Sequence, residues 1–277
     1  MDKRLNAFRP DLADARLQGS VDATCFVLGR EVQFRWPVAS VHRMADAGSM
    51  QLTQALMGET AVLFEDHNGW AWVQLTRDSY VGYVCSEALG DKVESTTHHV
   101  HVVSTLIYPK PDLKTQPVVF LPMNAAVAVV DEEGAYSRLA TGGYVFSKHL
   151  TSKKPKQDFV NVAEKFLHVP YLWGGKTHHG LDCSGLLQTA LHAVGTACPR
   201  DTDMQEASLG TALQINDLDG LTRGDLVFWQ GHVGIMHDES NLLHANGFHM
   251  QTVIEPLKLA ATRIADSHKP ITALKRL

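Results

Sequence analysis

With 277 residues, 44% hydrophobic and 20% charged, the chain is long enough for two or three domains and has the composition of an ordinary globular protein, which excludes a fibrous or disordered one. Its formal net charge of -5 leaves no basic field for nucleic acid or an anionic membrane, so neither partner is expected. Residues 1–19 carry charges throughout, unlike an export signal, and no stretch approaches the roughly 18 apolar residues of a membrane span. We therefore expect a cytoplasmic protein.

After an N-terminal extension over 1–19, residues 20–92 contain short β-type runs that are broken by turns. In TAVLFEDHNGWAWVQL, alternating aromatic and branched residues flank Asn68-Gly69, a pair typical of a tight β-hairpin turn. Residues 98–150 repeat the pattern of a turn glycine, an aromatic residue, a strand and a further turn that leads to Tyr-Val, in GAYSRLATGGYVF. The two regions predict two small antiparallel all-β barrels, which resemble bacterial SH3-like domains.

A polar linker with a proline, over 151–156, separates the barrels from residues 157–277, whose pattern of apolar residues differs. Apolar residues recur at helical spacing in 157–168 and again in 183–194, where Gly195 marks the end. The runs that follow are strand-like: GDLVFW, HVGIM, NLLHAN and PITALKRL. Helices followed by strands predict an α+β domain, with PITALKRL closing its sheet.

The segment richest in chemistry is Asp182-Cys183-Ser184, where a glycine-rich loop with aromatic residues runs into the second predicted helix. A cysteine in the first turn of a helix faces unpaired backbone N–H groups and the positive end of the helix dipole, and both favour a thiolate. Asp182 suits the N-cap position, although its negative charge opposes thiolate formation. Cys183 is therefore the candidate nucleophile, and its activation needs a base.

Two histidines further along the chain can supply that base. His232 and His244 lie in GHVGIM and LLHAN, on either side of the turn-prone sequence HDESN. A three-residue loop over 237–239 would place the two histidines opposite each other on one face of a hairpin, whereas a two-residue loop would not. With the three-residue loop, His232 can take the Cys183 proton while His244 fixes its tautomer and orientation.

The other cysteines and most of the histidines have a plainer interpretation. The four cysteines lie far apart without a C-x-x-C pair, so no disulfide framework is expected, and three of them are interpreted as small core residues: Cys25, Cys85 and Cys198. Several histidines cluster but lack the spacing of a metal-ligand set: His98, His99, His101, His178 and His179. We expect neither a metal nor a cofactor.

Five motifs in order, YLWGG with LDCSGLLQ, PRDTDMQ, RGDLVFW, GHVGIM and LLHAN, resemble the NlpC-type papain-like cysteine peptidases over residues 157–277. With two barrels in front, the chain is similar to the subgroup of γ-D-glutamyl-L-diamino acid endopeptidases. The resemblance implies an α+β papain-like catalytic domain preceded by two SH3-like barrels. It also implies Cys183 as nucleophile, His232 as general base and His244 as the polar third member, with the backbone N–H of Cys183 as an oxyanion donor.

The resemblance further implies how substrate is held. Members of the subgroup recognise the free amine of an N-terminal L-Ala with an acidic residue before the cysteine and a serine after it, here Asp182 and Ser184. An acidic residue and a tyrosine of the first barrel complete that pocket and match Glu59 and Tyr80, although Tyr83 is a rival and both tyrosines could be barrel core. The remaining candidates for substrate binding are Trp173, Arg200, Asp201 and Thr202, of which Arg200 could either meet a substrate carboxylate or be structural.

The expected activity is hydrolysis of the γ-D-Glu–diamino acid bond in short cell-wall peptides with a free N-terminal L-Ala, as part of cell-wall peptide recycling. The barrels would act as a lid that limits the substrate to short free-amine peptides. Two alternatives stay open: an amidase or acyltransferase on the same Cys–His scaffold, and a non-catalytic cell-wall-binding protein with a relic domain. The relic is disfavoured because Cys183, His232 and His244 are all present. Both meso-diaminopimelate and lysine fit the sequence, which does not indicate an oligomeric state.

Overall fold

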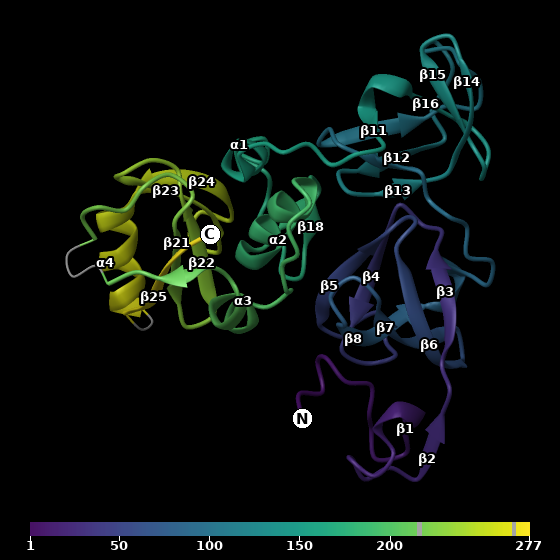
Figure 1. The fold of residues 1–277 in the computed structure, drawn as a ribbon, viewed down its shortest axis with the longest axis horizontal. Helices are drawn as coiled ribbons and strands as arrows, with labels where there is room; N and C mark the ends of the chain where they lie inside the picture. The colour runs from purple at the N-terminus through teal and green to yellow at the C-terminus, as the bar shows by residue number, and fades with distance from the viewer. Residues whose placement is uncertain (215–217, 268–269) are drawn as a thin grey trace. The chain divides into compact units, whose positions relative to one another are not determined.

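The computed structural model describes residues 1–214, 218–267 and 270–277. The chain divides into an N-terminal unit, Met1–Lys153, and a C-terminal unit, Lys154–Leu277, so the boundary falls inside the predicted linker. In Figure 1 the N-terminal unit runs from purple to teal and the C-terminal unit runs on through green to yellow. Among the described residues, no helix has both the length and the apolar composition needed to cross a bilayer.

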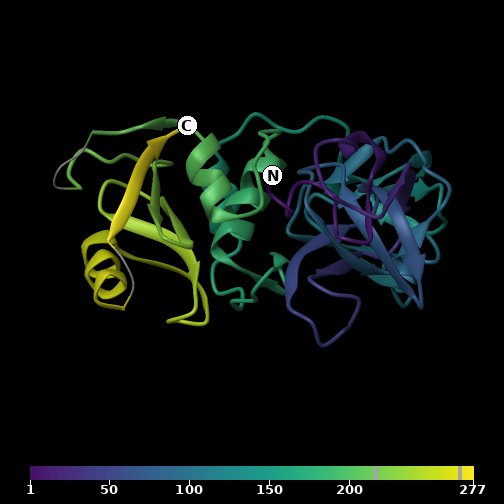
Figure 2. The ribbon, with the colours of Figure 1, turned by 90° about the horizontal axis from the view of Figure 1, so that it is seen from below.

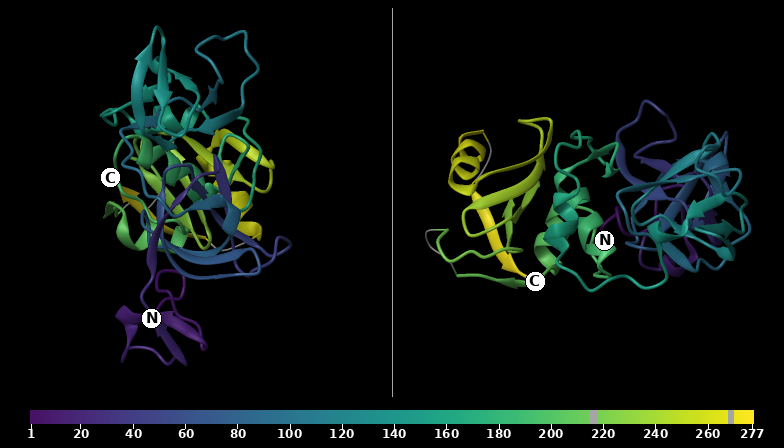
Figure 3. Two further views of the ribbon diagram at one scale, coloured as in Figure 1. Left: turned by 90° about the vertical axis from the view of Figure 1, so that its right-hand side faces the viewer. Right: turned by 90° about the horizontal axis from the view of Figure 1, so that it is seen from above.

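The N-terminal extension is part of the fold of the first barrel, which changes the predicted boundary at residue 20. Its strand β1 (Leu12–Asp14) pairs in parallel with β2 (Cys25–Val27), and a short 3-10 helix, η1 (Ala15–Leu17), follows β1. This segment is the purple part of Figure 3. Ala7 and Leu12 belong to an apolar cluster with barrel residues Phe64, Trp72 and Val81, so burial of apolar surface anchors the extension.

The first barrel is a seven-stranded antiparallel sheet in the order β5-β4-β8-β7-β6-β3-β9. The predicted hairpin is confirmed: His67 pairs with Trp70, and Asn68 and Gly69 have φ of 51° and 79°, as a type I′ turn requires. Buried residues such as Val32, Phe34 and Val73 fill its interior. Its elements are β3 (Arg30–Phe34), β4 (Val38–His42), β5 (Gln51–Leu56), β6 (Thr60–His67), β7 (Trp70–Leu75), β8 (Val81–Cys85), η2 (Ser86–Ala88) and β9 (Leu89–Gly90).

Residues 98–151 form three small sheets, in the orders β13-β10-β17, β11-β12 and β14-β15-β16. The succession β14, β15, β16, η3, β17 repeats the succession β6, β7, β8, η2, β9 of the first barrel, as the sequence pattern suggested. That this region is a second SH3-like barrel stays a prediction. Its elements are β10 (His98–Val100), β11 (Ser104–Ile107), β12 (Val119–Pro122), β13 (Ala126–Val127), β14 (Val129–Glu133), β15 (Tyr136–Leu139), β16 (Tyr144–Phe146), η3 (Ser147–His149) and β17 (Leu150–Thr151).

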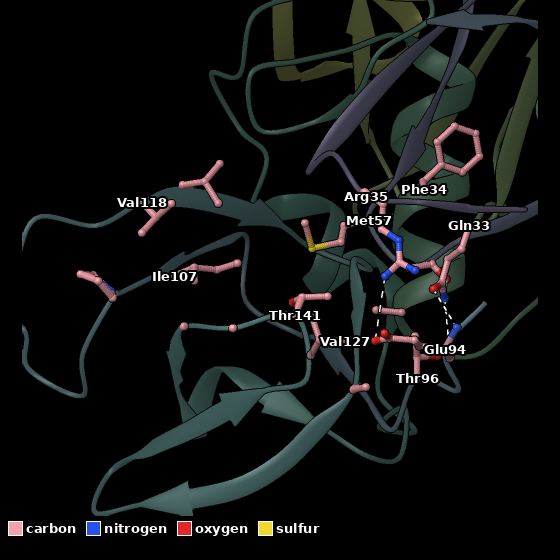
Figure 4. Close-up of a pocket in the computed structure, with 17 residues that line it drawn as sticks. Gln33, Phe34, Arg35, Met57, Glu94, Thr96, Ile107, Val118, Val127 and Thr141 are labelled. Carbon is pink, nitrogen blue, oxygen red and sulfur yellow. Dashed lines mark hydrogen bonds and ion pairs between the residues drawn. The ribbon is translucent and has the colours of Figure 1, made fainter. Parts of the chain in front are cut away.

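The N-terminal unit contains a pocket of about 500 Å³ between the first sheet and the strands that follow it (Figure 4). Apolar side chains, among them Met57 and Ile107, line it. On its polar side Gln33 Nε2 donates to the Glu94 carbonyl at 2.9 Å and Gln33 Oε1 accepts from the Glu94 N–H at 3.0 Å. All of its lining residues belong to the N-terminal unit, so this pocket includes none of the candidate catalytic residues.

The C-terminal unit packs helices against a six-stranded antiparallel sheet in the order β20-β25-β21-β22-β23-β24. Helix α2 contacts β22 and β23, and Figure 2 shows this helix in green beside the sheet. PITALKRL joins the sheet as predicted, but as the inner strand β25 between β20 and β21 and not as the strand that closes it. The elements are α1 (Phe159–Glu164), β18 (Lys176–Thr177), β19 (Gly180–Leu181), α2 (Cys183–Ala193), α3 (Thr202–Ser208), β20 (Thr211–Ala212), β21 (Leu226–Trp229), β22 (His232–Met236), β23 (Asn241–Asn246), β24 (Gln251–Pro256), α4 (Leu257–Ser267) and β25 (Ile271–Arg276).

The first helix of this unit is shorter than the predicted 157–168. After α1, the N–H groups of Lys165, Phe166 and Leu167 bond to carbonyls three residues earlier, so the chain tightens into turns. His168 then takes a φ of 65°, outside the helical range, and Pro170 disfavours a helical Val169. Apolar periodicity alone did not reveal this early end.

Candidate active site

Helix α2 begins at Cys183, as predicted, because Asp182 caps it. One carboxylate oxygen of Asp182 accepts from the Gly185 N–H at 2.7 Å, which satisfies a donor of the first turn. The other oxygen accepts from the Gly174 N–H at 2.8 Å, so the same side chain also holds the preceding glycine-rich loop. Asp182 thereby fixes the backbone on both sides of the candidate nucleophile.

The loop and helix approach each other most closely at Gly185. A Cβ at this position would lie 2.1 Å from the Gly175 carbonyl oxygen, so Gly185→Ala would force backbone to move. We expect Gly185→Ala to lower the free energy of unfolding by about 1–3 kcal/mol in denaturant titrations, because overpacking costs of this order are usual. Gly247→Ala is the matched control, since nothing lies within 4 Å of a Cβ there. Equal stability of the two variants would contradict the close packing.

His232 and His244 come together, but not in the predicted register. Ile235 pairs with Leu243 and Met236 with Leu242, which shifts the pairing by two residues and makes His244 a diagonal neighbour of His232 on the same face. The loop lies one residue later than 237–239 because the Asp238 carboxylate accepts from the N–H groups of Ser240 and Asn241 at 2.8 Å. His232 Nε2 lies 2.8 Å from His244 Nδ1.

Behind His244 lies an ion pair that the sequence reasoning missed. Glu255 Oε1 is 2.8 Å from His244 Nε2, and the guanidinium of Arg263 binds both Glu255 oxygens at 2.6 and 2.7 Å. Glu255 stands on β24 and Arg263 on α4, whereas His244 stands on β23. No short motif joins these three residues, so only the sheet order brings them together.

Burial and charge disfavour the Cys183 thiolate in this structure. Desolvation first, and then the charge of Asp182, raise the pKa of Cys183 to about 12, while backbone N–H groups of Val233 and Ser184 oppose the shift. The sequence predicted that the helix N-terminus would favour a thiolate. In the structure, burial and the charge of Asp182 have a larger effect on the thiol than the helix N-terminus has. The Val233 contact places the sulfur beside the strand residue that follows His232. Cys183 therefore depends on a base.

The Arg200 side chain is buried and bonded to other residues of the C-terminal unit. Its guanidinium is 1% exposed and donates to Asp182 Oδ2 and to Ser184 Oγ, both at 2.7 Å. Of the two roles considered for Arg200, these bonds support the structural one, because they engage it with the turn that carries Cys183. They also give Asp182 and Ser184 partners within the protein.

Other predicted residues of the C-terminal unit lie at the surface or at helix ends. Trp173 is 59% exposed, and Asp201 and Thr202 stand at the start of α3. Tyr171 was not singled out from the sequence. Burial first, and then the charges of Cys183 and Asp182, raise its pKa, which shows that it lies near the nucleophile. Its place in the YLWGG motif was the available signal. Among the described residues, no group of His, Cys, Asp or Glu is arranged to hold a metal.

The predicted residues of the first barrel are buried in the N-terminal unit. Glu59 is 6% exposed, lies 2.8 Å from Arg77 Nε, and lines a hollow of about 420 Å³. Tyr80 is 2% exposed, and the Tyr83 hydroxyl accepts from Arg9 at 2.8 Å. The structure thus brings the candidate catalytic residues together within one unit, while Glu59 and Tyr80 belong to the other.

Two family matches divide the chain as these units do. Residues 168–262, which include Cys183, His232 and His244, match the NlpC/P60 family. The chain carries an NlpC/P60 cysteine peptidase domain. Residues 41–89 match the bacterial dipeptidyl-peptidase SH3 domain, so the NlpC/P60 domain follows an SH3 domain of that kind.

Two relatives that match about three quarters of the chain are named as dipeptidyl-peptidases. The chain is 25% identical to "Gamma-D-glutamyl-L-lysine dipeptidyl-peptidase" of Bacillus cereus, over 74% of this chain and 70% of that protein. It is 26% identical to "Dipeptidyl-peptidase 6" of Lysinibacillus sphaericus, over 76% of this chain and 85% of that protein. The crystal structure of an NlpC/P60 family protein from Bacillus cereus matches the fold with a TM-score of 0.74 and 20% identity, over 89% of this chain and 99% of that one.

Proposed function

We propose that this cysteine peptidase hydrolyses the bond between γ-D-Glu and the diamino acid in short cell-wall peptides whose N-terminal L-Ala has a free amine. The observation that carries the proposal is the 2.8 Å contact of His232 with His244 on strands that α2 packs against. Cys183 stands at the start of that helix, and its thiol meets the backbone N–H of Val233, the residue after His232. That set suits acyl transfer through a thioester, because a base next to a cysteine can generate its thiolate. The names of the relatives support the γ-D-glutamyl bond as the target.

The proposed reaction has two halves. The Cys183 proton moves to His232, the sulfur attacks the γ-carbonyl carbon of D-Glu, and the backbone N–H of Cys183 stabilises the oxyanion. His232 then gives the proton to the leaving amine of the diamino acid, and the C–N bond breaks to leave an L-Ala-γ-D-Glu thioester. In the second half His232 takes a proton from water, the hydroxide attacks the thioester, and the proton returns to the sulfur.

The proposed amine site combines Asp182 and Ser184 with Glu59 and Tyr80 of the SH3 domain. A carboxylate that faces an ammonium in a closed site discriminates strongly against a blocked, uncharged N-terminus. The site would limit cleavage to short peptides, with the SH3 domain as the lid. Such a preference suits the recycling of released wall fragments in the cytoplasm, which we propose as the setting.

The amine site predicts a selective loss in a variant of Glu59. Glu59→Gln is expected to lower kcat/KM for free L-Ala-γ-D-Glu-L-Lys by roughly 10- to 100-fold, the worth of a hydrogen bond to a charged group. The N-acetylated peptide, already a poor substrate, should lose much less. Asp182→Asn should lower kcat/KM for the free peptide by at least as much, and because it also breaks the buried pair with Arg200 it should slow the acetylated peptide too. An equal loss for free and acetylated peptides in Glu59→Gln would contradict the amine site.

Digestion of defined peptides with the wild-type enzyme tests the function itself. We expect mass spectrometry to detect L-Ala-D-Glu and the free diamino acid from tripeptides that contain either lysine or meso-diaminopimelate. Cleavage after L-Ala, or cleavage of N-acetylated peptides at the same rate, would contradict the proposal. Turnover of an acyl ester without peptide cleavage would favour an amidase or acyltransferase. No turnover of either substrate would favour a non-catalytic binding protein.

A further inference from the structure

The candidate catalytic pair is the front of a longer chain of contacts. His232 Nε2 meets His244 Nδ1 at 2.8 Å, His244 Nε2 meets Glu255 Oε1 at 2.8 Å, and Arg263 binds Glu255 through both oxygens. His244 is 1% exposed, so its own two contacts are shielded from water, while Glu255 and Arg263 are 13% and 24% exposed. Four groups on β22, β23, β24 and α4 are thus joined in one line.

The ionised Glu255 decides which nitrogen of His244 carries the proton. The guanidinium of Arg263 and the bond to His244 hold the pKa of Glu255 at about 2, so its carboxylate can only accept. An unprotonated Nε2 would face that carboxylate oxygen at 2.8 Å, acceptor against acceptor. The Asn246 amide nitrogen, 3.0 Å from the same Nε2, is a donor and favours the opposite tautomer, but the contact with the ionised carboxylate is shorter and charge-assisted, and therefore stronger. His244 therefore carries its proton on Nε2.

The tautomer of His244 in turn decides that of His232. Burial lowers the pKa of His244, which keeps it neutral, and a neutral ring protonated on Nε2 has an acceptor at Nδ1. His232 Nε2 must then donate across the 2.8 Å contact. In a neutral His232 the other nitrogen, Nδ1, is then unprotonated, which is the state that a base for the cysteine needs.

Arg263 balances the charge of Glu255. The carboxylate raises the pKa of His244 and Arg263 lowers it, so the pair leaves His244 less basic than the carboxylate alone would. If His244 became charged, its Nδ1–H would donate to His232 and force the His232 proton onto Nδ1. The charged or titratable groups around His244 are His232 from β22, Glu255 from β24, Arg263 from α4 and, 3.8 Å from Glu255, His249 from the turn after β23.

We propose that Glu255 is a positioning residue that sets the tautomers of His244 and His232, and that Arg263 keeps His244 neutral. This inference rests on cysteine peptidase chemistry and not on the proposed substrate. Alkylation of Cys183 by iodoacetamide is therefore the suitable readout, because it reports thiolate formation without any peptide. The extent of modification is followed by mass spectrometry on the fragment that contains Cys183.

The two variants have different expected signatures. Glu255→Gln frees His244 to bind its proton on either nitrogen, so alkylation should slow by roughly 10- to 100-fold across the pH range, as other losses of supporting contacts do. Arg263→Gln leaves Glu255 unbalanced, which raises the pKa of His244 and should move the acid limb of the alkylation profile up by about one pH unit or more. Lys258→Gln, on the exposed part of α4, removes a charge from the same helix and should change neither.

Nitrogen NMR of the histidine-labelled wild-type protein tests the tautomer without relying on any variant. We expect the His244 ring to be neutral and protonated on Nε2, and that of His232 to be protonated on Nε2 at a pH where both are neutral. A His244 protonated on Nδ1 would overturn the proposal. An alkylation rate of Glu255→Gln equal to that of the wild type would also overturn it. So would a pH profile of alkylation that is the same for Arg263→Gln and Lys258→Gln.

Discussion

Replacing Cys183 by alanine is expected to abolish hydrolysis, lowering kcat by roughly 10,000-fold or more, as the loss of a nucleophile does in other enzymes that act through acyl intermediates. The thiol is buried at the start of α2, and its burial alone would hold it protonated. Turnover therefore requires both the sulfur and a base that takes its proton. Initial rates on a γ-D-Glu–diamino acid tripeptide, together with a circular dichroism melt to check folding, measure the effect.

Cys198→Ala is the matched control for that experiment. Cys198 is also a buried free cysteine of the C-terminal unit, and Gln205 Nε2 lies 3.4 Å from its sulfur. Its loss should cost some stability but leave most of the turnover. If Cys183→Ala stayed active while folded, or if Cys198→Ala were the inactive variant, Cys183 would not be the nucleophile.

Arg200→Leu is expected to give the largest loss of stability among single charge substitutions in the C-terminal unit. It would leave Asp182, which is 9% exposed, without its 2.7 Å partner, and breaking a buried pair from one side typically costs about 3–5 kcal/mol. Ser184 would lose its guanidinium donor at the same time. Urea titrations that follow tryptophan fluorescence measure the free energy of unfolding.

An exposed pair and a double variant complete this test. Lys258 and Asp219 are 73% and 75% exposed, so Lys258→Leu should change the free energy of unfolding by less than about 1 kcal/mol. Asp182→Asn/Arg200→Leu should recover part of the loss, because no carboxylate is then buried alone. A cost for Arg200→Leu as small as that for Lys258→Leu would mean that the buried pair does not hold the turn.

Local patterns in the sequence predicted the elements that carry the site. The N-cap residue Asp182 and the apolar spacing behind it predicted a helix that starts at Cys183, and Asn68-Gly69 predicted a type I′ turn, because few residues accept positive φ. The alternation of strand residues placed His232 and His244 on one face. Each of these features depends on residues within one helix or one hairpin.

The features that the sequence did not reveal have either a local side-chain cause or partners far apart in the sequence. The hairpin register shifted because the Asp238 side chain bonds to its own loop, and α1 ended early because of His168 and Pro170. Arg200 pairs with Asp182 across 18 positions, and Glu255 reaches His244 only through the order of the sheet. Charge partners that are far apart in the sequence produce no periodic pattern from which they could be predicted.

The most direct test of the account is the covalent intermediate. Enzyme mixed with L-Ala-γ-D-Glu-L-Lys, quenched in acid during turnover and digested, should yield a fragment containing Cys183 that carries the mass of the L-Ala-γ-D-Glu acyl group. His232→Ala should not accumulate it, because its thiol lacks the base. An acyl group on another residue, or turnover with no adduct on Cys183 at any quench time together with an undiminished rate in Cys183→Ala, would contradict the account.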